Sequence, residues 1–82
     1  MSTVLRGAGF RVVIYPNDHA PAHVHLVGSG EAKINLLGAG GHPHLVWATG
    51  MSMGDIRKGM QLVTDHQETL LEAWGRLHGR PF

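Results

Sequence analysis

The chain has 82 residues, with seven Lys and Arg against six Asp and Glu and no cysteine. This length predicts a single domain with a thin core. The absence of cysteine excludes disulfides and thiolate zinc sites, and the formal charge of +1 does not support a nucleic-acid partner bound by bulk charge. No apolar run approaches the roughly 20 residues that cross a bilayer, so a soluble cytoplasmic protein without membrane contact is expected.

The first half of the chain has the pattern of short strands. Residues 1–9 contain two glycines and no clear period, and we expect them to form a loosely ordered lead-in. Strands are predicted at residues 10–15, 22–27, 31–37 and 45–49, from β-branched and aromatic content or from alternation of apolar and polar residues. Segments rich in Gly, Pro, Asn and Asp separate these strands and supply the turns.

After Gly50 the period of the apolar residues changes from two to about 3.6. Residues 52–55 resemble a capping box with Asp in place of Glu. One amphipathic helix is predicted over about 54–77, with a kink near Gly59 and with Trp47 and Trp74 as core anchors. The expected fold is a single α+β domain over residues 1–82: a three- to four-stranded antiparallel sheet followed by one long amphipathic C-terminal helix packed on one sheet face.

Chemically active side chains are densest in the segment from Asp18 to His25, which reads Asp-His-Ala-Pro-Ala-His-Val-His. His23 and His25 are two apart on a predicted strand, so both rings lie on one face, which we expect to be exposed. Val24 and Leu26 then face the core. A proline stiffens the loop that enters this strand, and the loop is able to fold back over the histidine face.

Four segments carry a resemblance to a known family. They are Phe10 to Tyr15, the Asp18-His19-x-Pro21-x-His23-x-His25 signature, Glu31-Ala32-Lys33-Ile34, and the helix end Leu70-Leu71-Glu72-Ala73-Trp74. Over about residues 9–74 the chain resembles the small bacterial family named domain of unknown function 4160. By analogy, the resemblance implies a partner protein encoded nearby, in a gene pair of toxin–antitoxin type.

A metal site is one role for the histidines. A first-row divalent metal such as zinc, nickel, copper or manganese takes imidazole and carboxylate ligands. The ligands predicted here are His23 and His25, completed by His19 or Asp18. His42 and His44 form a second pair two residues apart and offer further ligands.

A ribonuclease or phosphodiesterase is the second role. Two imidazoles act as general base and general acid in such a site, and a carboxylate orients one ring. The candidate catalytic residues are Asp18, His19, His23, His25 and Arg11. Metal-assisted phosphodiester hydrolysis would combine the first two roles.

A non-enzymatic interaction module is the third role, and the sequence favours it. The chain has no phosphate-binding loop, nucleophile elbow or dinucleotide motif. We therefore expect an interaction module of a toxin–antitoxin-like gene pair, with a histidine-rich surface centred on residues 18–25. The expected partner is the small protein encoded nearby, a second copy of the chain in a homodimer, or both.

Overall fold

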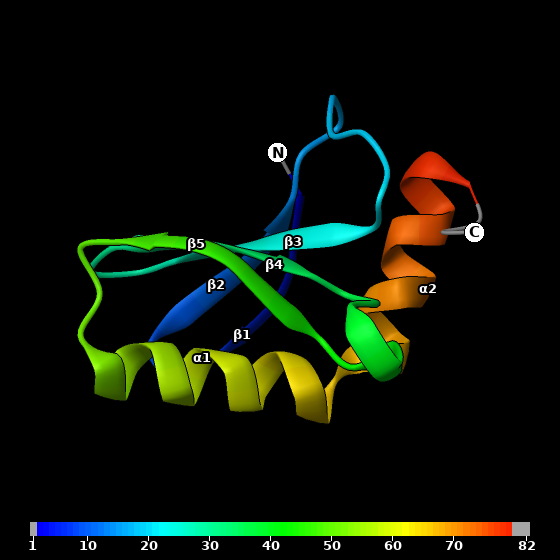
Figure 1. Cartoon of the computed structure of the whole chain (residues 1–82). Coiled ribbons are helices and arrows are strands. Elements are labelled where there is room, and N and C mark those ends of the chain that lie inside the picture. Colours follow the sequence, from blue (N-terminus) through cyan, green and yellow to red (C-terminus); the bar gives the residue numbers. More distant parts are fainter. Residues whose placement is uncertain (1, 80–82) are drawn as a thin grey trace.

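The computed structural model describes residues 2–79. Five strands form one antiparallel sheet in which every strand pairs with its neighbour in the chain, in the order β1-β2-β3-β4-β5. Two helices follow the last strand, and Figure 1 shows α1 lying along one face of the sheet and α2 rising beside the start of β3. The elements are β1 Ser2–Gly7, β2 Phe10–Ile14, β3 His23–Val27, β4 Glu31–Asn35, a short 3-10 turn Ala39–Gly41, β5 His44–Thr49, α1 Met53–Asp65 and α2 Gln67–His78.

The predicted α+β class and the antiparallel sheet are confirmed, but the number of strands is wrong. The segment expected to be a loose lead-in forms β1, which pairs along β2 from Ser2 opposite Ile14 to Gly7 opposite Phe10. A register shift between Thr3 and Leu5 inserts one extra residue. Such a bulge breaks the alternation of apolar and polar residues, which is why the sequence shows no strand period here.

The prediction of one long helix is also wrong. The helix does not kink at Gly59, which lies buried inside α1, close to the side chain of Leu26 on β3. The break falls at His66, where φ is −120° and ψ is 22°. The side-chain amide of Gln67 then donates hydrogen bonds to the carbonyls of Leu36 (2.7 Å) and Gly41 (2.8 Å), which fixes the start of α2 against the end of the sheet.

The start of the helical half agrees with the sequence. Ser52 is the N-cap of α1, and its side-chain oxygen accepts a hydrogen bond from the backbone N–H of Asp55 at 3.1 Å. This contact satisfies one of the backbone donors that a helix leaves free at its N-terminus.

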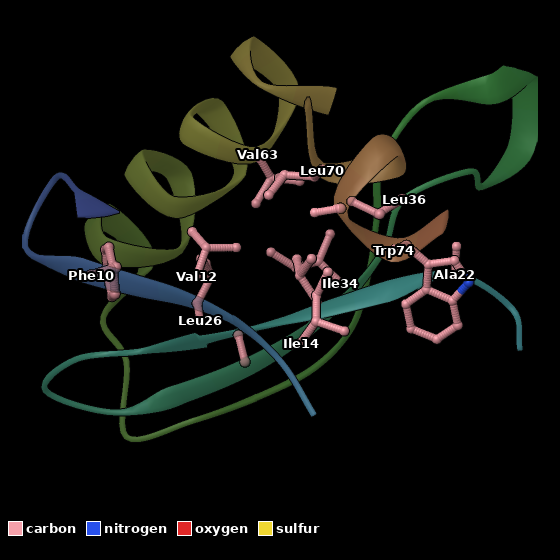
Figure 2. Close-up of a cluster of buried hydrophobic side chains, with 13 residues drawn as sticks. Phe10, Val12, Ile14, Ala22, Leu26, Ile34, Leu36, Val63, Leu70 and Trp74 are labelled. Atoms are coloured by element: carbon pink, nitrogen blue, oxygen red, sulfur yellow. The ribbon is translucent and has the colours of Figure 1, made fainter. Parts of the chain in front are cut away.

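The core lies between the helices and one face of the sheet, as Figure 2 shows. Its buried members are Phe10, Val12, Ile14, Ala22, Val24, Leu26, Ala32, Ile34, Leu36, Val63, Leu70, Ala73 and Trp74. Trp74 is a core anchor as predicted, whereas Trp47 is not, because its indole is 40% exposed. Trp47 is opposite Lys33 in the register of β4 and β5. The register shifts between Lys33 and Ile34, so Leu45 is opposite Ile34 and lies on the core side.

Helix α1 does not cover the other face of the sheet (Figure 1). Cross-strand pairs place Arg11, Val13, His25, Lys33 and Trp47 on this side, which we call the open face. Neither helix of residues 2–79 is long and apolar enough to cross a membrane.

Candidate metal centre

Strand β3 separates its side chains as the sequence predicts. Val24 (0% exposed) and Leu26 (1%) lie in the core, while His23 and His25 lie on the open face. The expectation that both imidazoles are exposed is wrong, because His23 is only 4% exposed and the side chain of His25 is 12% exposed. The ring of Trp74 on α2 lies 5.2 Å from that of His23, measured between centroids, and helps to cover it.

The turn that follows β2 holds Asp18 in place. One carboxylate oxygen of Asp18, Oδ2, accepts a hydrogen bond from the backbone N–H of Tyr15 at 3.0 Å. The backbone N–H of Asp18 donates in return to the Tyr15 carbonyl at 3.1 Å. His78 Nε2, near the end of α2, donates to the same carbonyl at 3.1 Å. The turn is therefore tied to the last turn of the helix, 63 residues away in the chain.

Asp18, His23 and His25 come together beneath this turn. Asp18 Oδ2 lies 3.4 Å from His23 Nε2, and Asp18 Oδ1 lies 3.7 Å from His25 Nε2. One ligand atom from each of the three residues lies within 4.8 Å of the other two. Bonds of 2.0–2.1 Å at a tetrahedral metal separate neighbouring ligand atoms by about 3.3 Å. The two contacts above use different oxygens of Asp18, and the three ligand atoms, separated by up to 4.8 Å, would move closer together around an ion.

A backbone carbonyl determines which ring nitrogen of His23 has a lone pair that faces Asp18. His23 Nδ1 lies 2.9 Å from the carbonyl oxygen of Pro21. A carbonyl only accepts, so Nδ1 must carry a hydrogen and donate it. In the neutral ring Nε2 then has a lone pair, and it faces a carboxylate oxygen that also only accepts. Two acceptors at 3.4 Å repel each other unless a proton or a cation lies between them.

His25 lies between two carboxylates. Its Nε2 faces Asp18, and its Nδ1 lies 3.3 Å from Oε2 of Glu31. The second contact does not have the alignment of a hydrogen bond, and the buried Nδ1 atom has no hydrogen-bond partner in the part of the chain that the structure describes. The rings of His23 and Tyr15 pack edge-on against His25, with centroids 5.3 and 4.8 Å from it. The packing fixes the ring and leaves Nε2 directed at Asp18.

The remaining predicted site residues lie outside this cluster. His19, His42 and His44 are exposed, and none of them belongs to the three-residue group. Asn35 on β4 pairs with His23 on one side and with His44 on the other, so a whole strand separates the two histidine pairs. Arg11 is on the open face, in register with Val27 rather than with either histidine.

Some residues that surround the cluster were not predicted from the sequence, among them Glu31, Trp74 and His78. Glu31 could have been found, because the Gly28 to Gly30 hairpin sets Val27 opposite Glu31 and so brings Glu31 diagonally next to His25. Trp74 and His78 could not have been found in this way. Their position depends on the break at His66 and the direction of α2, and no local pattern in the sequence encodes that direction.

Comparison with known proteins gives one finding. A family model described as "Domain of unknown function (DUF4160)" matches residues 9–75. The chain has no match among curated proteins or among solved structures.

Proposed function

The chain belongs to the DUF4160 family, and we propose that its function depends on a divalent transition metal ion bound by Asp18, His23 and His25. The observation that carries this proposal is the contact between His23 Nε2 and the Asp18 carboxylate at 3.4 Å. The Pro21 carbonyl fixes the tautomer, so the nitrogen that faces the carboxylate is the one that binds metal in a neutral ring.

The surroundings of the three residues support a metal site further. Metal-binding histidines usually donate their second ring N–H to a carbonyl or carboxylate, which orients the ring and raises its basicity. Pro21 supplies such a carbonyl to His23, and Glu31 lies near the second nitrogen of His25. The Asp18 carboxylate is oriented by the backbone N–H of Tyr15. Hydrogen bonds would thus hold Asp18 and His23 before the ion arrives, and the packed rings of Tyr15 and His23 would hold His25.

A set of three protein ligands favours hydrolytic chemistry. Structural zinc sites use four protein ligands, whereas catalytic sites use three and leave a position for water or substrate. A metal ion there lowers the pKa of bound water and polarises a phosphoryl or carbonyl oxygen. We therefore propose metal-assisted hydrolysis of a phosphodiester as the reaction class, with zinc or manganese as the first ions to test.

Metal analysis of the untagged protein tests the proposal. After treatment with chelator, the protein is titrated with zinc and with manganese, and bound metal is measured by elemental analysis. We expect one ion per chain in the wild type and none in Asp18→Asn or His25→Gln. Exposed histidines outside the cluster provide matched controls, and His42→Gln and His44→Gln should keep the ion.

Circular dichroism of each variant separates loss of the site from loss of the fold. A wild type that binds no metal, or His44→Gln and His42→Gln variants that lose it as completely as His25→Gln, would contradict the assignment. In the first case the Asp18–His23 contact would be an ion pair of a protonated imidazole, and hydrolysis by His23 and His25 without metal would be the next activity to assay.

An interaction module is the second candidate function. It is supported by an apolar hollow on α1, lined in part by Met53, Ile56 and Met60. Met53 is 71% exposed, the most of any large apolar side chain in residues 2–79. Methionine-rich surfaces adapt to protein partners, and the family resemblance suggests a small protein of a toxin–antitoxin-like pair as the partner. The hollow is on the helices, away from the Asp18 cluster.

Co-expression with the neighbouring gene product tests this second function. Met53→Lys should abolish co-purification of that product while leaving metal binding unchanged, because Met53 does not contact the cluster. A partner retained by Met53→Lys but lost by His25→Gln would assign the contact to the histidine-rich surface around residues 18–25 instead. Light scattering of the isolated chain separates a homodimer from a complex with another protein.

A further inference from the structure

Three basic side chains lie on the open face, and within residues 2–79 they have no acidic partner. Arg6 on β1 and Arg11 on β2 are directly opposite each other in register, so both point to the same side of the sheet. Lys33 on β4 is opposite His25. The ion pairs formed within residues 2–79 all involve histidine, so these three cations have no carboxylate partner there. Like charges placed opposite each other on neighbouring strands destabilise a sheet, and a bound anion would remove that repulsion.

An exposed aromatic ring lies on the same face. Trp47 on β5 is opposite Lys33, is 40% exposed, and has its ring centroid 6.1 Å from that of His25. A shallow hollow beside it is lined by Val27, Ser29, Glu31, Thr49 and Trp47. An exposed indole next to a cation is the arrangement on which a nucleic-acid base stacks while its phosphate meets the positive charge.

These features follow one another across the strands. Arg6 and Arg11 lie on β1 and β2, the Asp18 cluster on β3, Lys33 on β4 and Trp47 on β5. Neighbouring strands are about 4.8 Å apart, so β2 and β5 are separated by about 14 Å. The arrangement is therefore suited to an extended polyanion rather than to a single phosphate ion.

We propose that the open face binds single-stranded nucleic acid, with a base stacked on Trp47 and backbone phosphates at Lys33, Arg11 and Arg6. This inference rests on the proposed function in one respect, because it places the phosphodiester next to the metal centre. Binding itself uses other residues. Asp18 and Glu31 bring negative charge to the same face, so a divalent ion at the cluster should strengthen binding of the polyanion.

The overall charge of +1 is not an obstacle to this assignment. Three of the seven Lys and Arg residues are on the open face, and Arg57 and Lys58 are exposed on α1. Recognition would depend on the arrangement of a few charges and on stacking, rather than on bulk charge.

Fluorescence anisotropy with labelled 12-nucleotide strands tests the proposal. Single-stranded RNA, single-stranded DNA and a duplex are each titrated with the protein, in EDTA and with manganese. We expect the single strands to bind more tightly than the duplex, and Trp47→Ala to weaken them about tenfold through the lost stacking contact. Lys33→Ala and Arg11→Ala should each reduce the slope of log affinity against log salt by about 1.

Lys58→Ala is the matched control, because it removes one positive charge from the helical side of the molecule. Equal losses in Lys58→Ala and Lys33→Ala, or a duplex bound as tightly as the single strands, would overturn the proposal. Binding in EDTA that is lost in Trp47→Ala would support it, even if no metal binds to the cluster. One metal ion per chain without binding of either single strand would refute this inference and leave the metal site standing. Preference between RNA and DNA identifies the natural strand.

Discussion

The two faces of β3 differ in how completely their polar groups are satisfied. On the core face, Val24 and Leu26 pack against apolar side chains from the helices and have no polar atoms to satisfy. On the open face, His23 and His25 are nearly as enclosed, yet one ring points a lone pair at a carboxylate and the other has a buried nitrogen without a hydrogen bond.

This difference indicates that the core face stabilises the fold and that the open face holds the binding site. Buried polar atoms without partners cost free energy, so the core face accounts for most of the stability and the open face lowers it. A group of polar atoms that the fold holds together but leaves unsatisfied is typical of a binding site. Substitutions on each face can therefore separate stability from binding.

Loss of Trp74 should have the largest effect on the free energy of unfolding. Its indole is 2% exposed and packs in the core, so Trp74→Ala should destabilise the protein by about 3–5 kcal/mol. Glu68→Ala, at an exposed position of the same helix, should cost under about 0.5 kcal/mol. Denaturant unfolding measures both. Equal midpoints for the two variants would show that α2 is not packed as described.

Metal binding should raise the free energy of unfolding of the wild type, because the ion links side chains at the open face and leaves the core face unchanged. Zinc at about 100 times its dissociation constant should raise the free energy of unfolding by about 2.7 kcal/mol. Asp18→Asn lacks one ligand and should show no such rise, although its core face is unchanged. Thermal unfolding with and without zinc provides the comparison. A rise of the same size in Asp18→Asn would place the bound ion elsewhere.

Two helical glycines test how closely the core face is packed. A Cβ atom at Gly59 would meet the Leu26 side chain, whereas at Gly75 it would meet nothing within 4 Å. Gly59→Ala should therefore destabilise by about 1 kcal/mol, since overpacking outweighs the gain in helix propensity. Gly75→Ala should stabilise by up to about 1 kcal/mol. Denaturant unfolding should therefore give changes of opposite sign in the free energy of unfolding of the two variants. Stabilisation by both substitutions would mean that α1 does not pack tightly on β3.

Substitution of Leu77 should have the smallest effect on the free energy of unfolding. The sequence pattern assigns it to the apolar side of the helix, but its side chain is 44% exposed. Leu77→Ala should therefore change the free energy of unfolding by under about 0.5 kcal/mol. A loss of 2 kcal/mol or more, as is usual for a buried leucine (about 2–5 kcal/mol), would show that this end of α2 is covered in solution by a partner or a second copy.

Local patterns in the sequence were sufficient to predict the class of the fold and the grouping of the histidines. Alternation places His23 and His25 on one face of a strand and Val24 and Leu26 on the other, because successive side chains of a strand point to opposite sides. The capping residue Ser52 and the change of period after Gly50 likewise mark the start of the helical half. These are local properties, so the chain near each residue is sufficient to predict them.

The polar groups that complete the site could be identified only from the folded chain. Asp18 lies against the histidines in a turn whose Tyr15 carbonyl accepts a hydrogen bond from His78 on α2, and Trp74 covers His23 from the same helix. The direction of α2 depends on the break at His66, and the exposure of Trp47 depends on the register of β5. Both result from contacts between segments far apart in the chain. The free energy of such contacts depends on how whole elements pack, and no period or spacing in the sequence records it.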